Sequence, residues 1–326
     1  MPVLLSESDV RAVLSMDDLI QAMETALVQF SAGHVRQPLR TVVEVGGQKA
    51  FFGVMPAFIP DPPALGTKLV TVFAGNAAAR LPTHQATIVL LDSTTGQLMA
   101  VMDGRYITEA RTAAVSAVSV KLLARADSRS LAILGSGVQA RSHLEAIATV
   151  CPLQDVRVWS RSEARRNAFA WDMQRQGEPP IRAVPSAREA VDGADIVVLA
   201  TASREPVVAS EWIADGTHVC AVGACRPDQR EMDSALVKRA TLFVDSRTGA
   251  LAEAGDIVIP LREGTIAASH IAGELGEVAG GRARRRANAR EVTVFKSLGM
   301  AVEDVAAAHL AYVRAAERGL GRGFVL

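Results

Sequence analysis

The stretch LAILGSGVQA, residues 131–140, decides the fold of this 326-residue chain. An apolar run leads into Gly135, Gly137 and Ala140 in G-x-G-x-x-A spacing, and an amphipathic helical pattern follows. The first glycine permits the turn, the second lets backbone approach a pyrophosphate, and the third small residue lets helix and strand pack closely. The N-terminus of the helix offers N–H groups to phosphates. Because both flanks are correct, we predict a dinucleotide site rather than a purely structural turn, made by Gly135, Ser136, Gly137, Val138, Gln139 and Ala140.

Strand-like and helical segments alternate from this turn onward, in VRVWS, SEARRNAFAWDMQRQ, ADIVVLA, THVCAV and ATLFVD. Such alternation predicts a parallel sheet with crossover helices. Before the turn, residues 41–103 form short β-rich runs separated by Gly, Pro and Asn, which is typical of a mostly antiparallel sheet. The helical segment at 15–33 begins with Ser15 and Asp18 in capping-box spacing and ends at Gly33.

The length exceeds the usual size of one domain, so we expect two. The predicted class is α/β, with a Rossmann-type doubly wound parallel sheet and an N-terminal α+β domain for substrate binding and dimerisation. The predicted domains are 1–115, completed by a C-terminal helix at 298–326, and the dinucleotide-binding domain 116–297.

Composition excludes several classes of protein. Thirty-five basic and 35 acidic residues balance, so neither nucleic acid nor an anionic membrane is expected as a partner. The arginine-rich segment 280–290 is interpreted as a solvated loop. The N-terminus lacks a signal-peptide pattern and no apolar run approaches a membrane span, so we expect a cytoplasmic protein. The spacing of Cys151, Cys220 and Cys225 indicates neither disulfides nor a metal site.

Cofactor preference depends on the strand VRVW. Asp155 lies twenty residues after Gly135, the distance of a ribose-binding carboxylate, but it precedes the strand and so stands at the wrong end. At the carboxyl end stand Ser160, Arg161 and Ser162, which could hold a 2′-phosphate. We therefore predict NADPH, with NADH less preferred; the alternative is that Arg161 only faces solvent.

Three basic residues stand among apolar or small neighbours: Arg40, Lys68 and Arg111. Cations in such contexts are costly to bury without an anionic partner. A carboxylate ligand would supply that partner, and protein carboxylates would explain the pattern equally well. Of the histidines, His84 is interpreted as structural and His143 is assigned no chemistry.

Motifs along nearly the whole chain carry a resemblance: MPAF, GTKLVTVF, HQATIVLLDSTTGQLMAVMDGRYITEARTAAVSAVS, GSGVQARSH, VGACRPDQREMD, FVDS, GELGEV and TVFKSLGMAVEDVAAA. Together they resemble the ornithine cyclodeaminase and mu-crystallin family. The resemblance implies a homodimer in which the N-terminal sheet and the final helix form the substrate domain. It also implies that Arg40, Lys68 and Arg111 hold the substrate α-carboxylate beside the nicotinamide, and that Thr112 lies near the cofactor phosphates.

One departure from the cyclodeaminases affects the expected reaction. They carry an acidic residue for the substrate amine where this chain has Cys225, in VGACRPD. A mostly neutral thiol cannot replace a carboxylate there. The ketimine reductase branch is more similar, with a serine at that position before the same RPD. Asp228 could compensate, although a turn aspartate explains it as well.

The expected function is therefore NAD(P)H-dependent reduction of a cyclic imino acid, 1-pyrroline-2-carboxylate to L-proline or 1-piperideine-2-carboxylate to L-pipecolate. In this scheme Arg40 and Arg111 clamp the carboxylate, while Lys68 joins them or gives a proton to the imine nitrogen. Cys225 completes the predicted catalytic set. The alternatives are an alanine dehydrogenase or opine-type enzyme acting on an α-keto acid, then ornithine cyclodeaminase, and a crystallin-like protein that binds NADPH or a small ligand.

Overall fold

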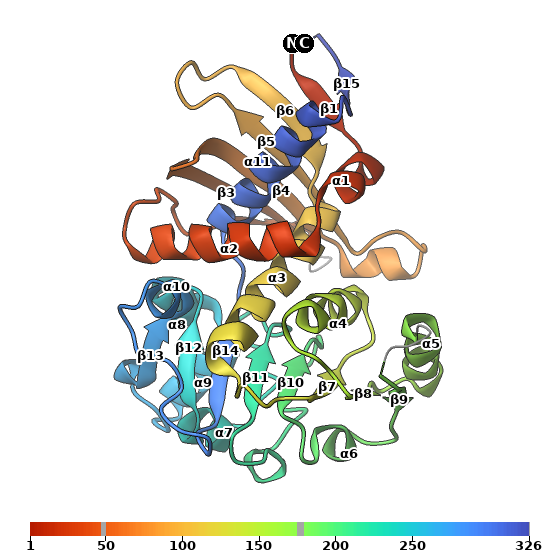
Figure 1. Cartoon of the computed structure of the whole chain (residues 1–326), viewed down its shortest axis with the longest axis vertical. Helices are drawn as coiled ribbons and strands as arrows, with labels where there is room; N and C mark the ends of the chain where they lie inside the picture. The colour runs from red at the N-terminus through yellow and green to blue at the C-terminus, as the bar shows by residue number, and fades with distance from the viewer. Residues whose placement is uncertain (47–49, 175–178, 326) are drawn as a thin grey trace. The chain divides into compact units, whose positions relative to one another are not determined.

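The computed structural model describes residues 1–46, 50–174 and 179–325, and the chain divides into two compact units. Unit 1 comprises Met1–Arg111 and Gly299–Leu326, and unit 2 is Thr112–Leu298 (Figure 1). The predicted α/β class is confirmed, since unit 2 contains the parallel sheet. The roles assigned to the two predicted domains stay predictions.

Unit 1 contains a sheet with the strand order β15-β1-β6-β5-β4-β3-β2. Neighbours run antiparallel from β2 to β6, whereas β1 lies parallel to β6. The strands are β1 (Val3–Leu5), β2 (Thr41–Val45), β3 (Ala50–Pro60), β4 (Pro63–Val72), β5 (His84–Leu91), β6 (Leu98–Asp103) and β15 (Arg322–Gly323). The helices are α1 (Glu7–Val13), α2 (Met16–Ser31), the 3-10 turn η2 (Ala74–Ala77) and α11 (Ala301–Glu317), while α3 (Arg105–Leu123) continues into unit 2.

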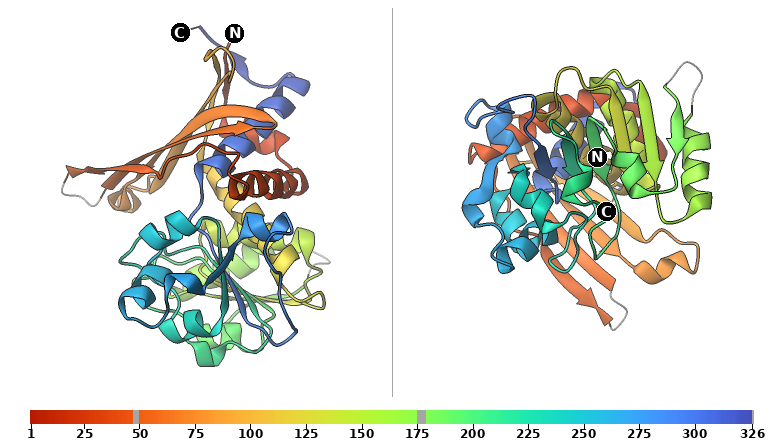
Figure 2. Two further views of the ribbon diagram at one scale, coloured as in Figure 1. Left: turned by 90° about the vertical axis from the view of Figure 1, so that its left-hand side faces the viewer. Right: turned by 90° about the horizontal axis from the view of Figure 1, so that it is seen from below.

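Helices α2 and α11 pack together, and α11 covers one face of the sheet at β3 and β4 (Figures 1 and 2). Ser15 caps α2 by accepting a hydrogen bond from the Asp18 N–H, and Gly33 follows the helix with φ of 77°. The predicted start and stop are thereby confirmed. The buried side of α2 includes Leu19, Ile20, Met23 and Leu27.

Unit 2 is a doubly wound parallel sheet with the order β13-β12-β14-β11-β10-β7-β8-β9. The strands are β7 (Ser130–Leu134), β8 (Asp155–Trp159), β9 (Ile181–Ala183), β10 (Ile196–Leu199), β11 (His218–Ala221), β12 (Thr241–Val244), β13 (Ile271–Glu274) and β14 (Thr293–Lys296). The helices are α4 (Val138–Val150), α5 (Glu163–Met173), α6 (Ala187–Val191), α7 (Ser234–Arg239), α8 (Arg247–Glu253), α9 (Gly255–Arg262) and α10 (Leu275–Ala279), with 3-10 turns η3 (Ser210–Trp212) and η4 (Ala268–His270).

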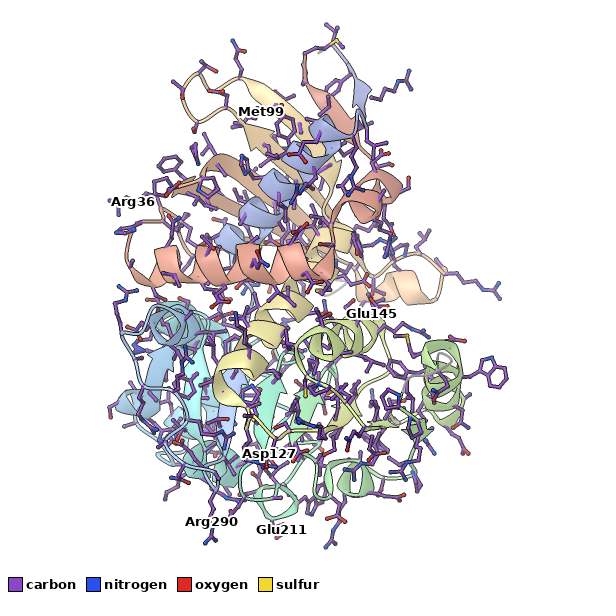
Figure 3. The ribbon with its side chains drawn as sticks, in the orientation of Figure 1. Arg36, Met99, Asp127, Glu145, Glu211 and Arg290 are labelled. Carbon is purple, nitrogen blue, oxygen red and sulfur yellow. The ribbon has the colours of Figure 1, made fainter. Side chains whose placement is uncertain are left out.

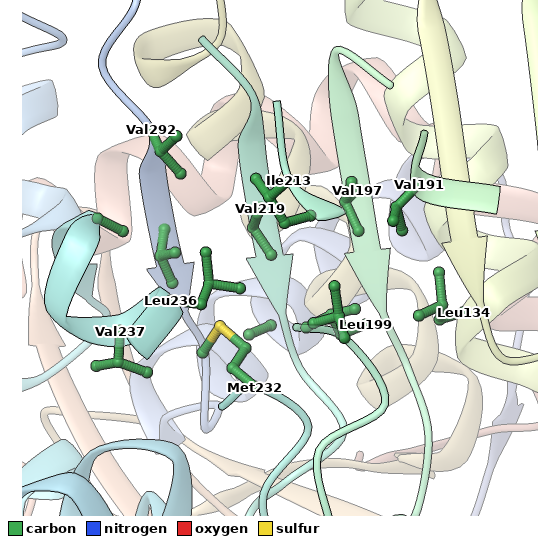
Figure 4. Close-up of a cluster of buried hydrophobic side chains, with 14 of the residues drawn as sticks. Leu134, Val191, Val197, Leu199, Ile213, Val219, Met232, Leu236, Val237 and Val292 are labelled. Atoms are coloured by element: carbon green, nitrogen blue, oxygen red, sulfur yellow. The ribbon is translucent and has the colours of Figure 1, made fainter. Parts of the chain in front are cut away.

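Strands β10 and β11 are buried along their whole length, as expected for parallel strands covered on both faces. One face packs in the cluster that includes Leu134, Val197, Val219 and Leu236 (Figure 4). The other packs in a second cluster with Ile147 and Phe169. The order of crossovers reverses between β7 and β10, which makes the carboxyl edge there the expected ligand crevice of this fold.

The arginine-rich segment 280–290 is not a wholly solvated loop. Arg290 is exposed and pairs with Asp215 at 2.8 Å (Figure 3). Arg286, however, is half-buried and donates to the Leu123 carbonyl at 2.7 Å and to Thr293 Oγ1 at 2.9 Å. The prediction is wrong for Arg286, because its guanidinium satisfies backbone and side-chain acceptors inside unit 2. No helix in the described part of the chain is long and apolar enough to cross a membrane.

Candidate active site

The glycine turn follows β7 and has the geometry that its sequence requires. Gly135 adopts φ of 127°, and a Cβ there would lie 2.4 Å from the Ala200 carbonyl oxygen. Its N–H donates to the Trp159 carbonyl at 2.8 Å. Only glycine tolerates this combination of dihedral and close approach.

Gly137 stands at the N-cap of α4 and meets a different requirement. Its φ is −90°, and a Cβ there would meet no described heavy atom within 4 Å. The helix start has no side-chain cap, so its backbone N–H groups are directed to whatever ligand lies there. Ala140 is fully buried and allows α4 to pack on the sheet. An open cradle at an uncapped helix start fits the pyrophosphate of a dinucleotide.

The residues predicted to meet a 2′-phosphate lie directly after β8. Ser136 Oγ donates to Ser160 Oγ at 3.0 Å, which joins this segment to the glycine turn. Ser162 is the N-cap of α5 and accepts from the Arg165 N–H at 3.4 Å, and Arg161 is exposed. Arg166, which sequence reasoning missed, is half-buried and donates to the Ser160 carbonyl at 3.2 Å.

Asp155 begins β8 and lies at the opposite end of that strand. Its carboxylate pairs with Arg157 at 3.1 Å and with Arg182 at 2.9 Å. These ion pairs account for Asp155 without a ligand.

A buried charged cluster lies inside unit 1. Lys68 stands on β4 between Met55 and Ile88, on the face covered by α11, and only 2% of it is exposed. Its Nζ lies 2.6 Å from Asp304 Oδ2. Arg111 Nε lies 2.9 Å from Asp304 Oδ1, and Arg111 Nη1 lies 2.6 Å from Glu303 Oε2. One carboxylate of α11 therefore bridges two of the predicted substrate-binding cations.

Sequence reasoning missed Glu303 and Asp304 as partners of these cations. Both are fully buried in the first turn of α11, within the segment VEDVAAA. Two adjacent carboxylates among alanines and valines are a usable signal, since buried charges require partners. What a single sequence does not indicate is which cations they meet.

The cluster controls the charge of its lysine. The pKa of Lys68 is lowered to about 8, mainly by burial. The positive charges of Arg111 and Arg40 also lower it, whereas the negative charge of Asp304 raises it. Burial alone would raise the pKa of Asp304, but Arg111 and Lys68 hold it below its ordinary value. Lys68 is thus mostly an ammonium at pH 7 that loses its proton more readily than an exposed lysine.

Two further residues singled out in the sequence, Arg40 and His84, interact electrostatically with this cluster. Arg40 is half-buried immediately before β2 and is close enough to affect Lys68. His84 begins β5, and burial together with Lys68 and Arg111 lowers its pKa to about 4. The His84 imidazole is therefore neutral at pH 7.

The remaining predicted residues belong to unit 2. Thr112 lies half-buried on α3. Cys225 lies half-buried in the loop after β11, where its Sγ donates to the Val222 carbonyl at 3.3 Å. Asp228 is exposed and forms loose ion pairs with Arg204 at 3.6 Å and Arg226 at 3.7 Å, so its carboxylate has protein partners. Among the described residues, no group of His, Cys, Asp and Glu side chains is arranged to hold a metal ion.

These features define a protein with a dinucleotide-binding fold in unit 2 and a buried cluster of ion pairs in unit 1, and comparison with known proteins identifies its family. The chain belongs to the ornithine cyclodeaminase/mu-crystallin family, whose sequence model matches residues 1–319. The predicted family is confirmed.

Individual relatives are similar over almost their whole length. The chain is 45% identical over 315 residues to ketimine reductase mu-crystallin of Mus musculus, which covers 95% of this chain and 96% of the relative. It is 36% identical over 320 residues to the Delta(1)-pyrroline-2-carboxylate reductase of Bacillus cereus, covering 98% of each.

Two solved structures are also similar to this chain over nearly its whole length. The Thermococcus litoralis Delta(1)-pyrroline-2-carboxylate reductase, in complex with NADH and L-proline, is 42% identical with a TM-score of 0.96, covering 99% of this chain and 100% of that one. An archaeal alanine dehydrogenase dimer with bound NAD is 32% identical with a TM-score of 0.94, covering 99% of each chain.

Proposed function

We propose that this protein is a nicotinamide-dependent reductase of cyclic α-imino acids, forming L-proline from 1-pyrroline-2-carboxylate or L-pipecolate from 1-piperideine-2-carboxylate. The observation that carries the proposal is the buried cluster of Lys68, Arg111 and Asp304, in a chain whose similar proteins include ketimine and pyrroline-2-carboxylate reductases.

In the proposed reaction, the substrate carboxylate binds Arg40 and Arg111, which fixes the orientation of the imine carbon. A nicotinamide cofactor, when bound, would supply the hydride that reduces this carbon. The C=N bond becomes C–N, and the nitrogen takes a proton, for which Lys68 is the proposed donor. A pKa of about 8 suits this role, because Lys68 is charged at pH 7 yet gives up its proton at modest cost.

The direct test follows NADPH or NADH oxidation by absorbance on adding 1-pyrroline-2-carboxylate, with ornithine plus NAD as a parallel reaction. We expect rapid imine-dependent turnover. Lys68→Ala should lower kcat by about 100-fold or more with little change in cofactor affinity. Unchanged turnover with weakened cofactor binding would remove Lys68 from the chemistry.

We further propose NADPH as the preferred cofactor. The support is the position of Ser160 beside the glycine turn, the exposed Arg161, and the neighbouring guanidinium of Arg166. Arg161→Asp should weaken NADPH much more than NADH, since it replaces a counter-charge of the 2′-phosphate by a repelling one. Unchanged discrimination between the two cofactors would overturn the assignment of Arg161 to the 2′-phosphate.

A second candidate activity is the reductive amination of an open-chain keto acid. The archaeal alanine dehydrogenase of the same fold supports testing it. Pyruvate with ammonia, in place of the cyclic imine, should give much slower NADPH oxidation. Faster oxidation with pyruvate would replace the imine reductase proposal.

We also propose a homodimer built on the face of the unit 1 sheet opposite to α11. Several apolar side chains on that face are only half-buried, as with Val54, Leu69 and Val89, and edge strand β2 leaves Val43 50% exposed. Accessible apolar side chains gathered on one face are typical of an interaction surface. Light scattering should give twice the chain mass of 34.5 kDa, and Val54→Lys should shift the protein toward monomer.

A further inference from the structure

Two loops at the carboxyl edge of the unit 2 sheet are joined by one buried carboxylate. Glu231, fully buried, belongs to the segment between β11 and α7. Its Oε1 accepts from the Thr201 N–H at 2.6 Å and from Thr201 Oγ1 at 2.7 Å, in the loop after β10. Its Oε2 accepts from the Gly223 N–H at 2.8 Å, in the loop after β11.

Gly223, in the loop after β11, shows how closely the two loops approach each other. A Cβ on Gly223 would lie 2.0 Å from the Thr201 carbonyl oxygen and 2.6 Å from Glu231 Oε1. Gly223 precedes Cys225 by two positions, so the same contact fixes the start of the Cys225 loop. The backbone directly after Cys225 is held as well, because the Gly255 N–H donates to the Arg226 carbonyl at 3.2 Å.

Glu231 is part of a buried charged group. Asp256, at the start of α9, accepts from the Glu231 N–H at 2.7 Å, and its other oxygen lies 3.2 Å from Lys296 Nζ at the end of β14. Burial and the neighbouring Asp256 raise the pKa of Glu231 to about 7. Burial alone would lower the pKa of Lys296, but Asp256, Cys225 and Glu231 together raise it. The segment that carries Cys225 is therefore supported by its own Glu231 and by charged groups on two neighbouring elements, α9 and β14.

The position of the loops after β10 and β11 suggests why Glu231 joins them. Strands β10 and β11 lie on the side of the switch point that is opposite to β8, where the adenosine end of a dinucleotide is expected. Loops after β10 and β11 then line the nicotinamide half of the crevice. We propose that Glu231 is a positioning residue that holds the Thr201 and Gly223 loops in the arrangement that receives the nicotinamide ring. The inference rests on the proposed function only in requiring a nicotinamide cofactor.

Glu231→Gln tests this directly because it keeps volume and changes one atom. An amide offers one acceptor oxygen, whereas Glu231 receives donors on both oxygens, so one of the two loops must lose its contact. The cofactor should be compared with ADP-ribose, which lacks the nicotinamide ring. By calorimetry we expect NADH affinity to fall by about 10-fold or more while ADP-ribose affinity stays within about twofold, because only the nicotinamide loops are displaced.

Asp195→Asn is the matched control. Asp195 lies at the opposite, amino edge of the same sheet, where one oxygen accepts from the Arg129 N–H, the Ser130 N–H and Ser130 Oγ at 2.8 to 2.9 Å. Its substitution should cost stability without changing the ratio of NADH to ADP-ribose affinity. Equal losses for both ligands in Glu231→Gln would show a merely structural role and overturn the inference.

Thr201→Val provides a second variant if Glu231→Gln does not fold. It removes one hydroxyl contact to Glu231 and keeps the backbone contact. It should lower NADH affinity selectively by a smaller factor, and an unchanged NADH to ADP-ribose ratio would contradict the inference. Because these measurements need no substrate, a failure of the imine reductase assay leaves the result on Glu231 separate and interpretable.

Discussion

Asp304 contacts Lys68 and Arg111, the two buried cations among the described residues of unit 1, and its removal should be visible in the pH dependence of the reaction. Wild-type kcat/KM should fall as pH rises through about 8, where Lys68 loses its proton. Asp304 raises the pKa of Lys68, so Asp304→Asn should move this alkaline limb to lower pH. The pH profile of imine reduction measures the shift, and an alkaline limb that does not move would exclude Lys68 as its origin.

Glu303→Gln is the control for that experiment. Glu303 pairs with Arg111 at 2.6 Å, whereas Asp304 is the carboxylate that contacts Lys68 directly. Both substitutions remove a carboxylate from a buried ion pair and should cost about 3 kcal/mol of unfolding free energy. Asp304→Asn should move the alkaline limb much further than Glu303→Gln does, because only Asp304 is seen to pair directly with Lys68, and this difference separates the effect on Lys68 from loss of stability.

Within the element formed by β7, the glycine turn and α4, two neighbouring glycines should respond differently to alanine. Gly135→Ala introduces a Cβ at φ of 127° and 2.4 Å from a carbonyl oxygen, so unfolding free energy should fall by more than about 1 kcal/mol. Gly137→Ala places its Cβ in open space and should leave stability nearly unchanged, yet weaken cofactor binding because the methyl group occupies the phosphate cradle. Thermal unfolding and cofactor titration of both variants check this contrast.

The same elements show what the sequence could predict. The turn, strand and helix at 130–150 are encoded locally, since glycine spacing and apolar periodicity fall within one stretch. The pairing of Arg111 with Asp304 spans 193 positions, and no local pattern specifies such a contact. At Ser162 the sequence left two roles open, because a serine hydroxyl can bind a phosphate or cap a helix equally well. In the structure Ser162 caps α5.

For the molecule as a whole, buried histidines should make the fold sensitive to acid. Burial lowers the pKa of His143 to about 4 and that of His218 to about 3. Unfolding returns both to about 6.5, so their contribution to stability is present above pH 6.5 and is lost as pH falls toward 4 and 3. Each contributes a slope of up to about 1.4 kcal/mol per pH unit in that range.

Urea unfolding at several pH values between 7.5 and 4.5 measures this slope. His143→Gln should flatten it relative to wild type, because glutamine does not titrate there. His34→Gln, at an exposed position, should leave the slope as it is. Parallel curves for wild type and His143→Gln would show that His143 does not titrate on unfolding.

The position of α11 in the chain has a consequence for protein synthesis. Unit 2 lies between the two segments of unit 1, so all of residues 112–298 leave the ribosome before Glu303 and Asp304 do. Until then, Lys68 and Arg111 have no α11 carboxylates to neutralise them, and burying them would be unfavourable. We expect unit 2 to fold first, and unit 1 to finish folding only after α11 has been synthesised. A chain terminated shortly before residue 303 would be able to fold a dinucleotide-binding unit, but it would lack the two carboxylates that pair with Lys68 and Arg111.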